Sequence, residues 1–222
     1  METVAVNGKS HADQLLTIPP PNFKVALFTV RGDAPLVMNK FSAKAREQMR
    51  QKQEAGSTGK KGTKREAKDF NLAYEQAIHR SREGWVGIPA GAVRSSMISA
   101  CKIVGFHMTK GKLAVFIQAD GFEVTDGTPL IKITKGEPHY HESLVRNATG
   151  VADIRPRAMF DEGWEADVRV KFDADMFTLE DVANLLVRAG AQVGLLEGRH
   201  DSSKSCGQGW GTFEVVERKE GT

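Results

Sequence analysis

The sequence predicts a single α+β domain that carries two large insertions. Its 222 residues are enough to bury a core, and 40% hydrophobic with 27% charged residues is an ordinary globular composition. Patterning predicts strand, helices, strands, a hairpin, a helix and a strand, in that order. This order is the βαββαβ plan of a ferredoxin-like or RRM-like sheet, with insertions at about 40–85 and 120–155. We therefore expect an extended segment at 1–22, one domain at 23–217 and a tail at 218–222.

The first part of the chain predicts one strand and two helical stretches. Residues 23–32, FKVALFTVRG, alternate with apolar side chains on both faces, which indicates a central strand. A helix is expected from Ser42, but its pattern ends at Gly56, and residues 56–63 predict a mobile loop. Helical character returns over about 66–80.

The middle of the chain predicts a helix followed by strands. GWVGIPAGAVRSSMISACKIVG places a proline at a helix start and small residues on one face, suited to packing on a sheet. GKLAVFIQAD and FEVTDGTPLIKIT are strand-like and are broken at Asp-Gly pairs. The following GEPHYHESLVRNATGVADIRPR is polar and shows no clear period.

The last third predicts a hairpin, a helix and a strand. RPRAMF-DEG-WEADVRVKF has the form of a hairpin whose turn is 161–163. TLEDVANLLVRAGAQVGL predicts an amphipathic helix that is capped by Thr178 and ended by Gly190. GTFEVVE indicates the final strand.

Positive charge is concentrated in residues 40–68, which we call the basic arm. It contains ten basic and three acidic side chains, a net +7 in a chain whose total is +3, so the remainder carries −4. The ten are Lys40, Lys44, Arg46, Arg50, Lys52, Lys60, Lys61, Lys64, Arg65 and Lys68. Lys and Arg bind nucleic-acid phosphates by releasing counterions, and a flexible arm can fold onto a strand. The arm predicts sequence-independent phosphate contact, with a solvated linker as the alternative.

Residues 190–211, which we call the glycine segment, hold six glycines in 22 residues. Arg199, His200, Lys204 and Trp210 lie among them. Glycine permits close approach of the backbone to a ligand, and Arg or an aromatic ring can stack on bases, so these four are candidate contacts. A long mobile connection before the last strand is the alternative. No phosphate loop of the GxxxxGK[ST] type occurs in the chain, and we expect no cofactor.

His139, Tyr140 and His141 form the one constellation with catalytic potential. Metal-independent RNases use His and Tyr as general acid and base, and His can also bind metal. No third ligand is evident in the sequence, so we expect no metal site. Stacking of His139 or Tyr140 on a base, or simple surface placement, is the favoured interpretation.

Arginines at strand spacing extend the candidate surface. Arg155 and Arg157 are two residues apart, so both point to one side of a strand and could continue a basic track across the sheet. Ion pairs with Asp153 or Asp161 are the alternative. Arg94, in the helix expected in the middle of the chain, is a further candidate contact.

Three segments resemble, in order, the RAMP-type backbone subunit of CRISPR effector complexes, and more closely its short stand-alone relatives among phage proteins. They are GDAPLVMNKFS, GIPAGAVRSSMISACKIV and LVRAGAQVGLLEGRHDSSKSCGQGWGTFEV. The resemblance implies an RRM-like fold whose copies polymerise along a guide RNA without chemistry. In that family an inserted loop threads between bases, and the two insertions stand where such loops fall. Leu196 and Glu197 depart from the small, glycine-rich run expected there.

The sequence leads to three functional hypotheses. The first is a non-enzymatic, sequence-independent binder of single-stranded RNA or DNA that assembles head-to-tail along the strand. The second is a metal-independent RNA-processing endonuclease that uses His139, Tyr140 or His141. The third is a protein–protein interaction module whose arm docks an acidic surface.

The cysteines and the absence of targeting signals suggest a compartment. Cys101 and Cys206 match no metal or redox spacing, so we expect free thiols. Neither a signal peptide nor a membrane span is evident, so we expect a cytoplasmic protein.

Overall fold

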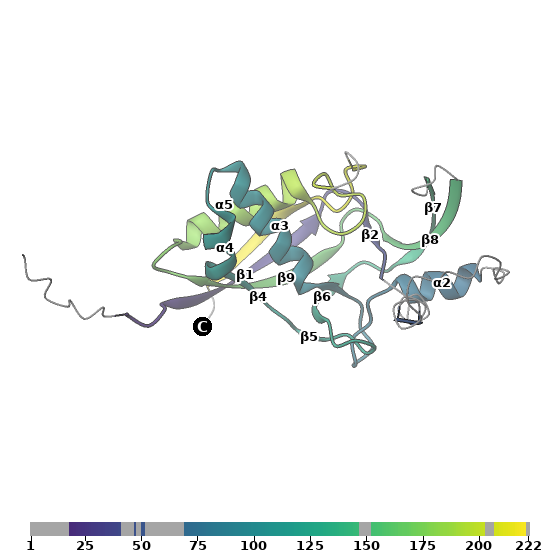
Figure 1. Ribbon diagram of the computed structural model, residues 1–222, viewed down its shortest axis with the longest axis horizontal. Coiled ribbons are helices and arrows are strands. Elements are labelled where there is room, and N and C mark those ends of the chain that lie inside the picture. The colour runs from purple at the N-terminus through teal and green to yellow at the C-terminus, as the bar shows by residue number, and fades with distance from the viewer. Residues whose placement is uncertain are drawn as a thin grey trace, which may run out of the picture.

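The computed structural model describes residues 18–40, 47, 50–51, 69–146, 152–202 and 207–220. The described residues form two antiparallel sheets with helices packed on them, which confirms the predicted α+β class (Figure 1). The larger sheet has seven strands and the smaller has three. No described helix has both the length and the hydropathy that a transmembrane span requires.

The larger sheet has the strand order β10–β1–β9–β6–β3, with β4 also paired to β9 and β5 to β6. Its strands are β1 Phe23–Gly32, β3 Gly87–Pro89, β4 Val115–Gln118, β5 Gly121–Phe122, β6 Pro129–Lys135, β9 Glu165–Asp173 and β10 Phe213–Glu220. β1 therefore has a partner on each side, so the expectation of a central strand is confirmed. Beyond β9 lie β4 and β6, each paired with a different part of that strand.

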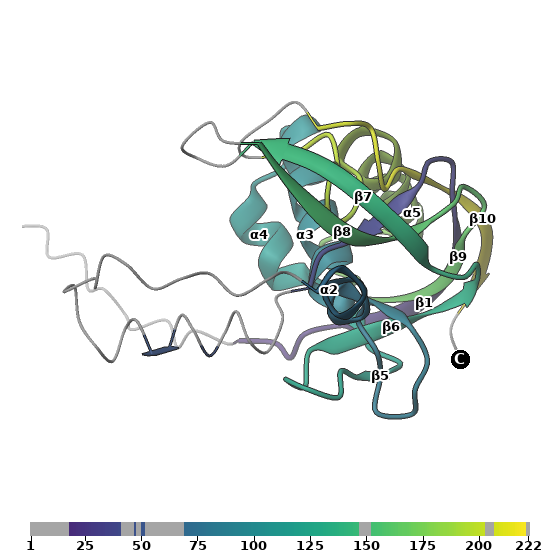
Figure 2. The ribbon, with the colours of Figure 1, turned by 90° about the vertical axis from the view of Figure 1, so that its right-hand side faces the viewer.

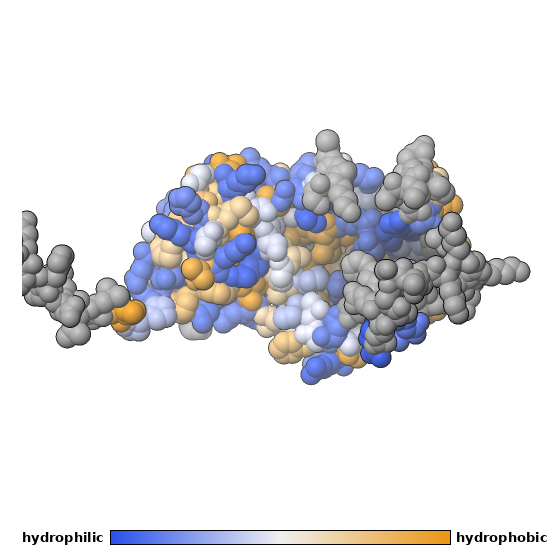
Figure 3. Space-filling view, in the orientation of Figure 1, coloured by the Kyte–Doolittle hydropathy of each residue, from blue (hydrophilic) through white to orange (hydrophobic). Residues whose placement is uncertain are grey.

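Three helices cover one face of the larger sheet (Figure 1). They are α3 Ala90–Ile103, α4 Met108–Ala114 and α5 Leu179–Arg188, and the π-helical turn η1 Ala189–Val193 continues α5. Thr178 caps α5 in a capping box with Asp181, and the hydrogen bonds from Thr178 lower the pKa of the Asp181 carboxyl. Figure 3 shows hydrophilic and hydrophobic residues interspersed over this helical layer, as expected for a solvated surface.

The core lies between these helices and the sheet. On β1, Ala26, Phe28 and Val30 are at most 1% exposed, and the β9 residues paired with them are buried as well. Val182 and Leu186 of α5 are fully buried against this layer. Each such side chain contributes about 1.5–3 kcal/mol by leaving water. The alternate residues of the same strands form the opposite face, which we call the open face.

The smaller sheet has the order β2–β8–β7 and lies at one end of the molecule (Figure 2). Its strands are β2 Leu36–Met38, β7 His139–Arg146 and β8 Ala152–Phe160. Helix α2, Phe70–Ala77, packs on it, and Figure 2 shows α2 end-on beside the β7–β8 hairpin. The rings of Tyr74 and Tyr140 are 5.7 Å apart, and the Tyr74 hydroxyl donates to the Pro138 carbonyl oxygen at 2.9 Å.

The predicted hairpin about residues 161–163 is wrong, because β8 and β9 belong to different sheets. Both strands alternate as expected, but alternation does not specify a partner. The burial of Trp164 determines the path of the chain between β8 and β9. Trp164 is 1% exposed, and its Nε1 donates to the Ala34 carbonyl oxygen at 3.0 Å. The Gly32 amide also donates to the Trp164 carbonyl oxygen at 2.8 Å. These contacts bring the chain from the smaller sheet into the larger one.

The polar segment without a period contains the actual hairpin. β7 and β8 pair over their whole described length, from His139 opposite Met159 to Arg146 opposite Ala152. Leu144 is 73% exposed and Ile154 is 43% exposed, whereas Ser143 is 8% exposed, so the apolar side chains in the far half of this hairpin do not form the buried face that produces clean alternation. GKLAVFIQAD also differs from expectation, because its first part belongs to α4 and only 115–118 form a strand.

Gly190 does not end the helix. It lies in η1, and the chain turns out of helical geometry at Gly194, whose φ is 79°. A Cβ on Gly190 would overlap the carbonyl oxygen of Phe213, so the glycine permits close approach of η1 to β10. The helix expected from Ser42 lies mostly outside the described residues, and Cys101 is a buried free thiol whose pKa is raised by burial.

We predict that Gly190→Ala lowers the free energy of unfolding by about 1–3 kcal/mol or more, because backbone must move to admit the methyl group. Gly91→Ala is the matched control, since it lies in α3 with no atom within 4 Å of the added Cβ. That change should leave stability unchanged or raise it by about 0.5–1 kcal/mol. Urea unfolding of both variants measures the difference, and equal stabilities would contradict the packing described for η1.

Candidate nucleic-acid interface

Two of the ten cations of the basic arm belong to the described residues. Arg50 is exposed, and its Nε lies 3.9 Å from Oε2 of Glu47. Lys40 stands at the start of the arm and is largely buried. The other eight lie outside the described residues: Lys44, Arg46, Lys52, Lys60, Lys61, Lys64, Arg65 and Lys68.

Lys40 is tied to the domain by a buried ion pair. Its side chain is 11% exposed, and its Nζ donates to Oε1 of Glu123, a carboxylate with no exposed surface. Lys40 Nζ also donates to the Thr125 hydroxyl at 2.7 Å. The backbone amides of Thr125 and Asp126 donate to the other oxygen of Glu123 at 3.0 and 3.1 Å. Lys40 therefore anchors the start of the arm, and its charge is neutralised there.

The end of the arm is fixed at the same helix. The Lys40 amide donates to the carbonyl oxygen of Ala77, the last residue of α2, at 3.2 Å. Asp69, which follows the arm, caps the first turn of α2 by accepting from the Leu72 amide at 2.9 Å. Both ends of residues 41–68 thus meet α2, which lies against the β7–β8 hairpin.

The hairpin separates the predicted histidine and tyrosine side chains. His139 and His141 lie on one face of β7, and Tyr140 lies on the other, beside α2. His139 Nδ1 is 3.8 Å from Asp161, and the Tyr140 hydroxyl donates to Glu142 at 2.7 Å. This hydrogen bond raises the pKa of the Tyr140 phenol. The three side chains do not converge on one point.

Arg157 and Arg155 both have acidic partners. Arg157 is 6% exposed, and its Nε donates to Oε2 of Glu197 in the glycine segment at 2.5 Å. Arg155 lies on the same face of β8, and its Nε donates to Asp153 at 3.0 Å. The pair with Glu197 joins the smaller sheet to the glycine segment, so Arg157 has a structural partner that the sequence does not reveal. Glu197 and Glu123 are both residues whose structural importance sequence reasoning missed.

The described part of the glycine segment is bonded to its surroundings along its backbone. The Gly211 amide donates to the Pro35 carbonyl oxygen at 2.7 Å, and the Glu197 amide donates to Val37 at 3.2 Å. A Cβ on Gly198 would overlap the indole of Trp210, so glycine is required there for close packing. These contacts favour a loop with defined packing and hydrogen bonds over the mobile connection, which the sequence analysis gave as the alternative.

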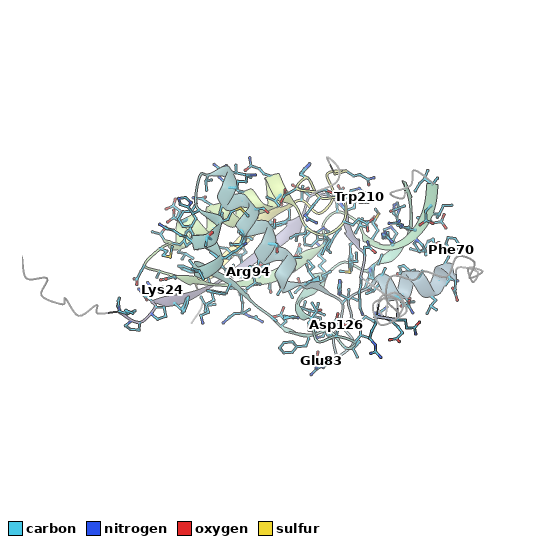
Figure 4. The ribbon with its side chains drawn as sticks, viewed as in Figure 1. Lys24, Phe70, Glu83, Arg94, Asp126 and Trp210 are labelled. Carbon is cyan, nitrogen blue, oxygen red and sulfur yellow. The ribbon has the colours of Figure 1, made fainter. Side chains whose placement is uncertain are left out.

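The four candidate contacts of the glycine segment differ in their exposure and in their partners. Trp210 is half-buried, with its ring edge-on to His141 at 5.7 Å. Arg199 Nη1 donates to the carbonyl oxygen of Leu196, a residue with a positive φ of 57°. His200 is exposed, and Lys204 lies outside the described residues. The structure thus brings Trp210 together with the hairpin, at the end of the molecule that Figure 4 shows near Phe70.

Arg94 lies apart from this group. It reaches from α3 to the edge of the larger sheet, where Nε donates to the Val115 carbonyl oxygen at 2.8 Å and Nη2 to that of Lys112. Its partners are neutral, so its positive charge is retained. Within the described ranges, no group of three His, Cys, Asp or Glu side chains is arranged to hold a metal ion.

No protein-family model matches the chain, and no curated protein matches its sequence. Among solved structures, the chain is similar to a chain of type III-B Cmr-beta bound to cognate target RNA, with a TM-score of 0.48 and 10% identity over 89% of this chain. The match spans 60% of the length of that Cmr-beta chain. Csc2 of Thermofilum pendens is also similar, with a TM-score of 0.33 and 11% identity over 90% of this chain and 68% of that one.

We predict that Glu123→Ala lowers the free energy of unfolding by about 3–5 kcal/mol, because it leaves the buried Lys40 ammonium without a counter-charge. The control is Glu75→Ala, which breaks the exposed Arg80–Glu75 pair of 2.9 Å. Exposed pairs contribute about 1 kcal/mol or less, so the control should be nearly as stable as the parent protein. Denaturant unfolding measures both. Equal small losses would show that Glu123 does not anchor the arm.

Proposed function

We propose that the protein is a non-enzymatic, sequence-independent binder of single-stranded nucleic acid that assembles head-to-tail along the strand. The observation that carries this proposal is the attachment of the basic arm. Residues 41–68 hold nine basic and three acidic side chains, and both ends of this segment meet α2. The first end is also held by the buried Lys40–Glu123 pair. The arm therefore begins and ends at a helix that packs against the β7–β8 hairpin.

The charge distribution supports phosphate contact. Outside residues 40–68 the protein carries −4, so attraction for a polyanion comes from the arm rather than from the overall charge. Many described cations of the candidate surface are neutralised, since Lys40, Arg155 and Arg157 each bind a carboxylate. Phosphate contacts of this kind are independent of base sequence and are weakened by salt.

We further infer an RRM-like or ferredoxin-like βαββαβ core made of β1, α3, β4, β9, α5 and β10. The support is the strand order β10–β1–β9–β4, in which neighbouring strands are antiparallel. One insertion then contains the arm and α2, and the other contains β5–β8. Residues 23–217 make one domain in this view.

We propose no nuclease activity for His139, Tyr140 and His141. Cleavage by a His–Tyr acid–base pair needs both groups within reach of one phosphate, whereas Tyr140 lies on the opposite face of β7 from the two histidines. The two histidines have different neighbours, since His139 lies 3.8 Å from Asp161 and His141 lies edge-on to Trp210 at 5.7 Å. Incubation of concentrated protein with RNA in the presence of chelator should leave the RNA intact. Discrete cleavage products would restore the endonuclease hypothesis.

Head-to-tail assembly follows from the energetics of non-specific binding. One domain of this size covers only a few nucleotides, and each phosphate or stacking contact is weak, so useful affinity requires neighbours on the same strand. A contact between two different surfaces of the same chain does not close on itself, and it generates a helix or ladder. The β7–β8 hairpin, with Leu144 73% exposed, is a projecting element that can reach a neighbouring copy.

We predict that neutralising the arm abolishes most of the affinity. Lys60→Gln, Lys61→Gln, Lys64→Gln and Arg65→Gln together should weaken binding to all single strands about equally, and each lost phosphate contact should lower the slope of log K against log salt by about 0.7. The control is a protein whose residues 56–65 are shuffled, which keeps the charge and should keep the affinity. Salt titrations by filter binding on RNA and on DNA measure both effects. Unchanged binding after neutralisation would contradict the role of the arm.

Complex size should increase with strand length. We expect a ladder of discrete oligomers on strands of increasing length, because each copy occupies a fixed number of nucleotides and contacts the next. Mass photometry or multi-angle light scattering of the complexes measures the stoichiometry. A stoichiometry that stays constant as the strand lengthens would mean that the protein does not polymerise along it.

A further inference from the structure

Cations on the open face of the larger sheet and at its β4 edge are paired with carboxylates at one end of the sheet and not at the other. Near the smaller sheet, Arg31 and Lys135 both bind Glu165, at 2.9 and 3.3 Å. These contacts lower the pKa of the Glu165 carboxyl, which therefore stays ionised and cancels part of their charge. At the other end, neither Lys171 nor Arg94 has a carboxylate within 4.0 Å among the described residues.

Two aromatic rings lie beside these uncompensated cations. Phe23 of β1 and Phe116 of β4 meet edge-to-face, with ring centroids 5.7 Å apart. Lys171 Nζ lies 4.3 Å from the centroid of Phe23, and the Arg94 guanidinium lies 5.0 Å from that of Phe116. Phe23 remains 38% exposed, although it is an apolar ring on a strand. We call these four residues the β1–β4 platform.

The surroundings of the platform are poor in acidic groups. Residues 84–119, which include α3, α4 and β4, contain four basic residues and no Asp or Glu, in a protein that carries −4 outside residues 40–68. Asp173 is paired in register with Phe23, and its carboxylate accepts the Asp175 amide at 3.0 Å. This hydrogen bond leaves the charge of Asp173 in place, but no Lys or Arg lies within 4.0 Å of that carboxylate among the described residues. Asp120 is occupied by Arg169. Lys171 and Arg94 therefore keep charges that no described carboxylate pairs with, and an outside partner can bind them.

We propose that the β1–β4 platform is a second contact for the strand, in which Phe23 stacks on one base and Lys171 and Arg94 bind the adjoining phosphates. Exposed aromatic rings next to cations suit a single strand, because bases stack on rings and phosphates bind ammonium and guanidinium groups. An acidic protein surface would satisfy the cations, but it would leave the Phe23 ring without a stacking partner. The partner is therefore single-stranded nucleic acid.

This inference rests on the proposed function and extends it. Figure 4 shows Lys24, which follows Phe23 in β1, at the end of the domain opposite Phe70, and Phe70 begins α2 just after the arm. A strand that reaches both the arm and the platform runs along the length of the domain. The platform adds base stacking, a contact that does not depend on salt, to the electrostatic contact of the arm.

The test uses the full chain with an intact arm and two kinds of strand, an oligothymidine and an abasic strand of the same length. Lys171→Gln should weaken binding to both strands about fivefold at 0.1 M salt and lower the salt slope by about 0.7. Phe23→Leu should weaken binding to the oligothymidine about fivefold or more, with an unchanged slope, and should leave binding to the abasic strand unchanged.

The matched control is Lys135→Gln, an exposed lysine of the same sheet whose charge is paired with Glu165. It should bind both strands with parental affinity and slope, and thermal unfolding should show that all three variants are folded. Suppose that neutralising the arm abolishes binding, whereas the Lys171→Gln and Phe23→Leu variants bind with parental affinity. That result would overturn the platform and leave the proposed function standing. An equal loss of affinity of the Phe23→Leu variant for both strands would also overturn the platform, since the ring would then affect only the fold of the protein. A protein that binds no strand in any form would overturn both.

Discussion

Antiparallel pairing of β1 with β9 is the interaction on which the rest of the structure depends. The register runs without a break from Phe23 opposite Asp173 to Arg31 opposite Glu165. Since side chains alternate along both strands, this single register places one apolar set against the helices and the charged and aromatic set on the open face. Where the pairing ends, the Gly32 amide donates to the Trp164 carbonyl oxygen, and a Cβ on Gly32 would overlap the indole of Trp164. The smaller sheet begins from this crossing.

The peripheral elements are held by a few polar contacts rather than by a second large core. A buried Lys40–Glu123 pair anchors the arm, Arg157 and Glu197 join the smaller sheet to the glycine segment, and Tyr74 joins α2 to the base of β7. Buried ion pairs contribute little to net stability when compared with apolar replacements, but they are geometrically specific. Their effect here is to fix where the arm leaves and re-enters the domain. The body of the protein can therefore be acidic while a basic segment begins and ends at α2.

Sequence patterning predicted the elements that bury one face. It failed where contacts between residues far apart in the sequence determine the path of the chain. The strand at 23–32 and the cap at Thr178 follow from alternation and capping chemistry that act within a few residues. The path of residues 161–164 depends on the burial of Trp164, and the function of Gly190 depends on β10, which lies about twenty residues further on. No local pattern reports such contacts.

For the candidate site as well, the sequence reveals composition but not the contacts that form on folding. The concentration of charge in the arm is visible from composition, whereas the pairing that neutralises Lys40, Arg155 and Arg157 involves carboxylates that only folding or strand geometry brings close. The uncompensated Lys171 escaped notice because its importance lies in the acidic partner it lacks among the described residues. Arg94 was included as a candidate, but its contact with Phe116 depends on the packing of α3 against β4.

Limited trypsin digestion with and without single-stranded nucleic acid tests whether the arm itself contacts the strand. Residues 41–68 contain nine Lys and Arg cleavage sites between anchored ends. If the arm binds the strand, a saturating amount of strand slows cleavage within these residues by an order of magnitude or more, while cleavage elsewhere changes little. Cleavage of the arm at the same rate in the bound and free protein would show that the arm does not contact the strand.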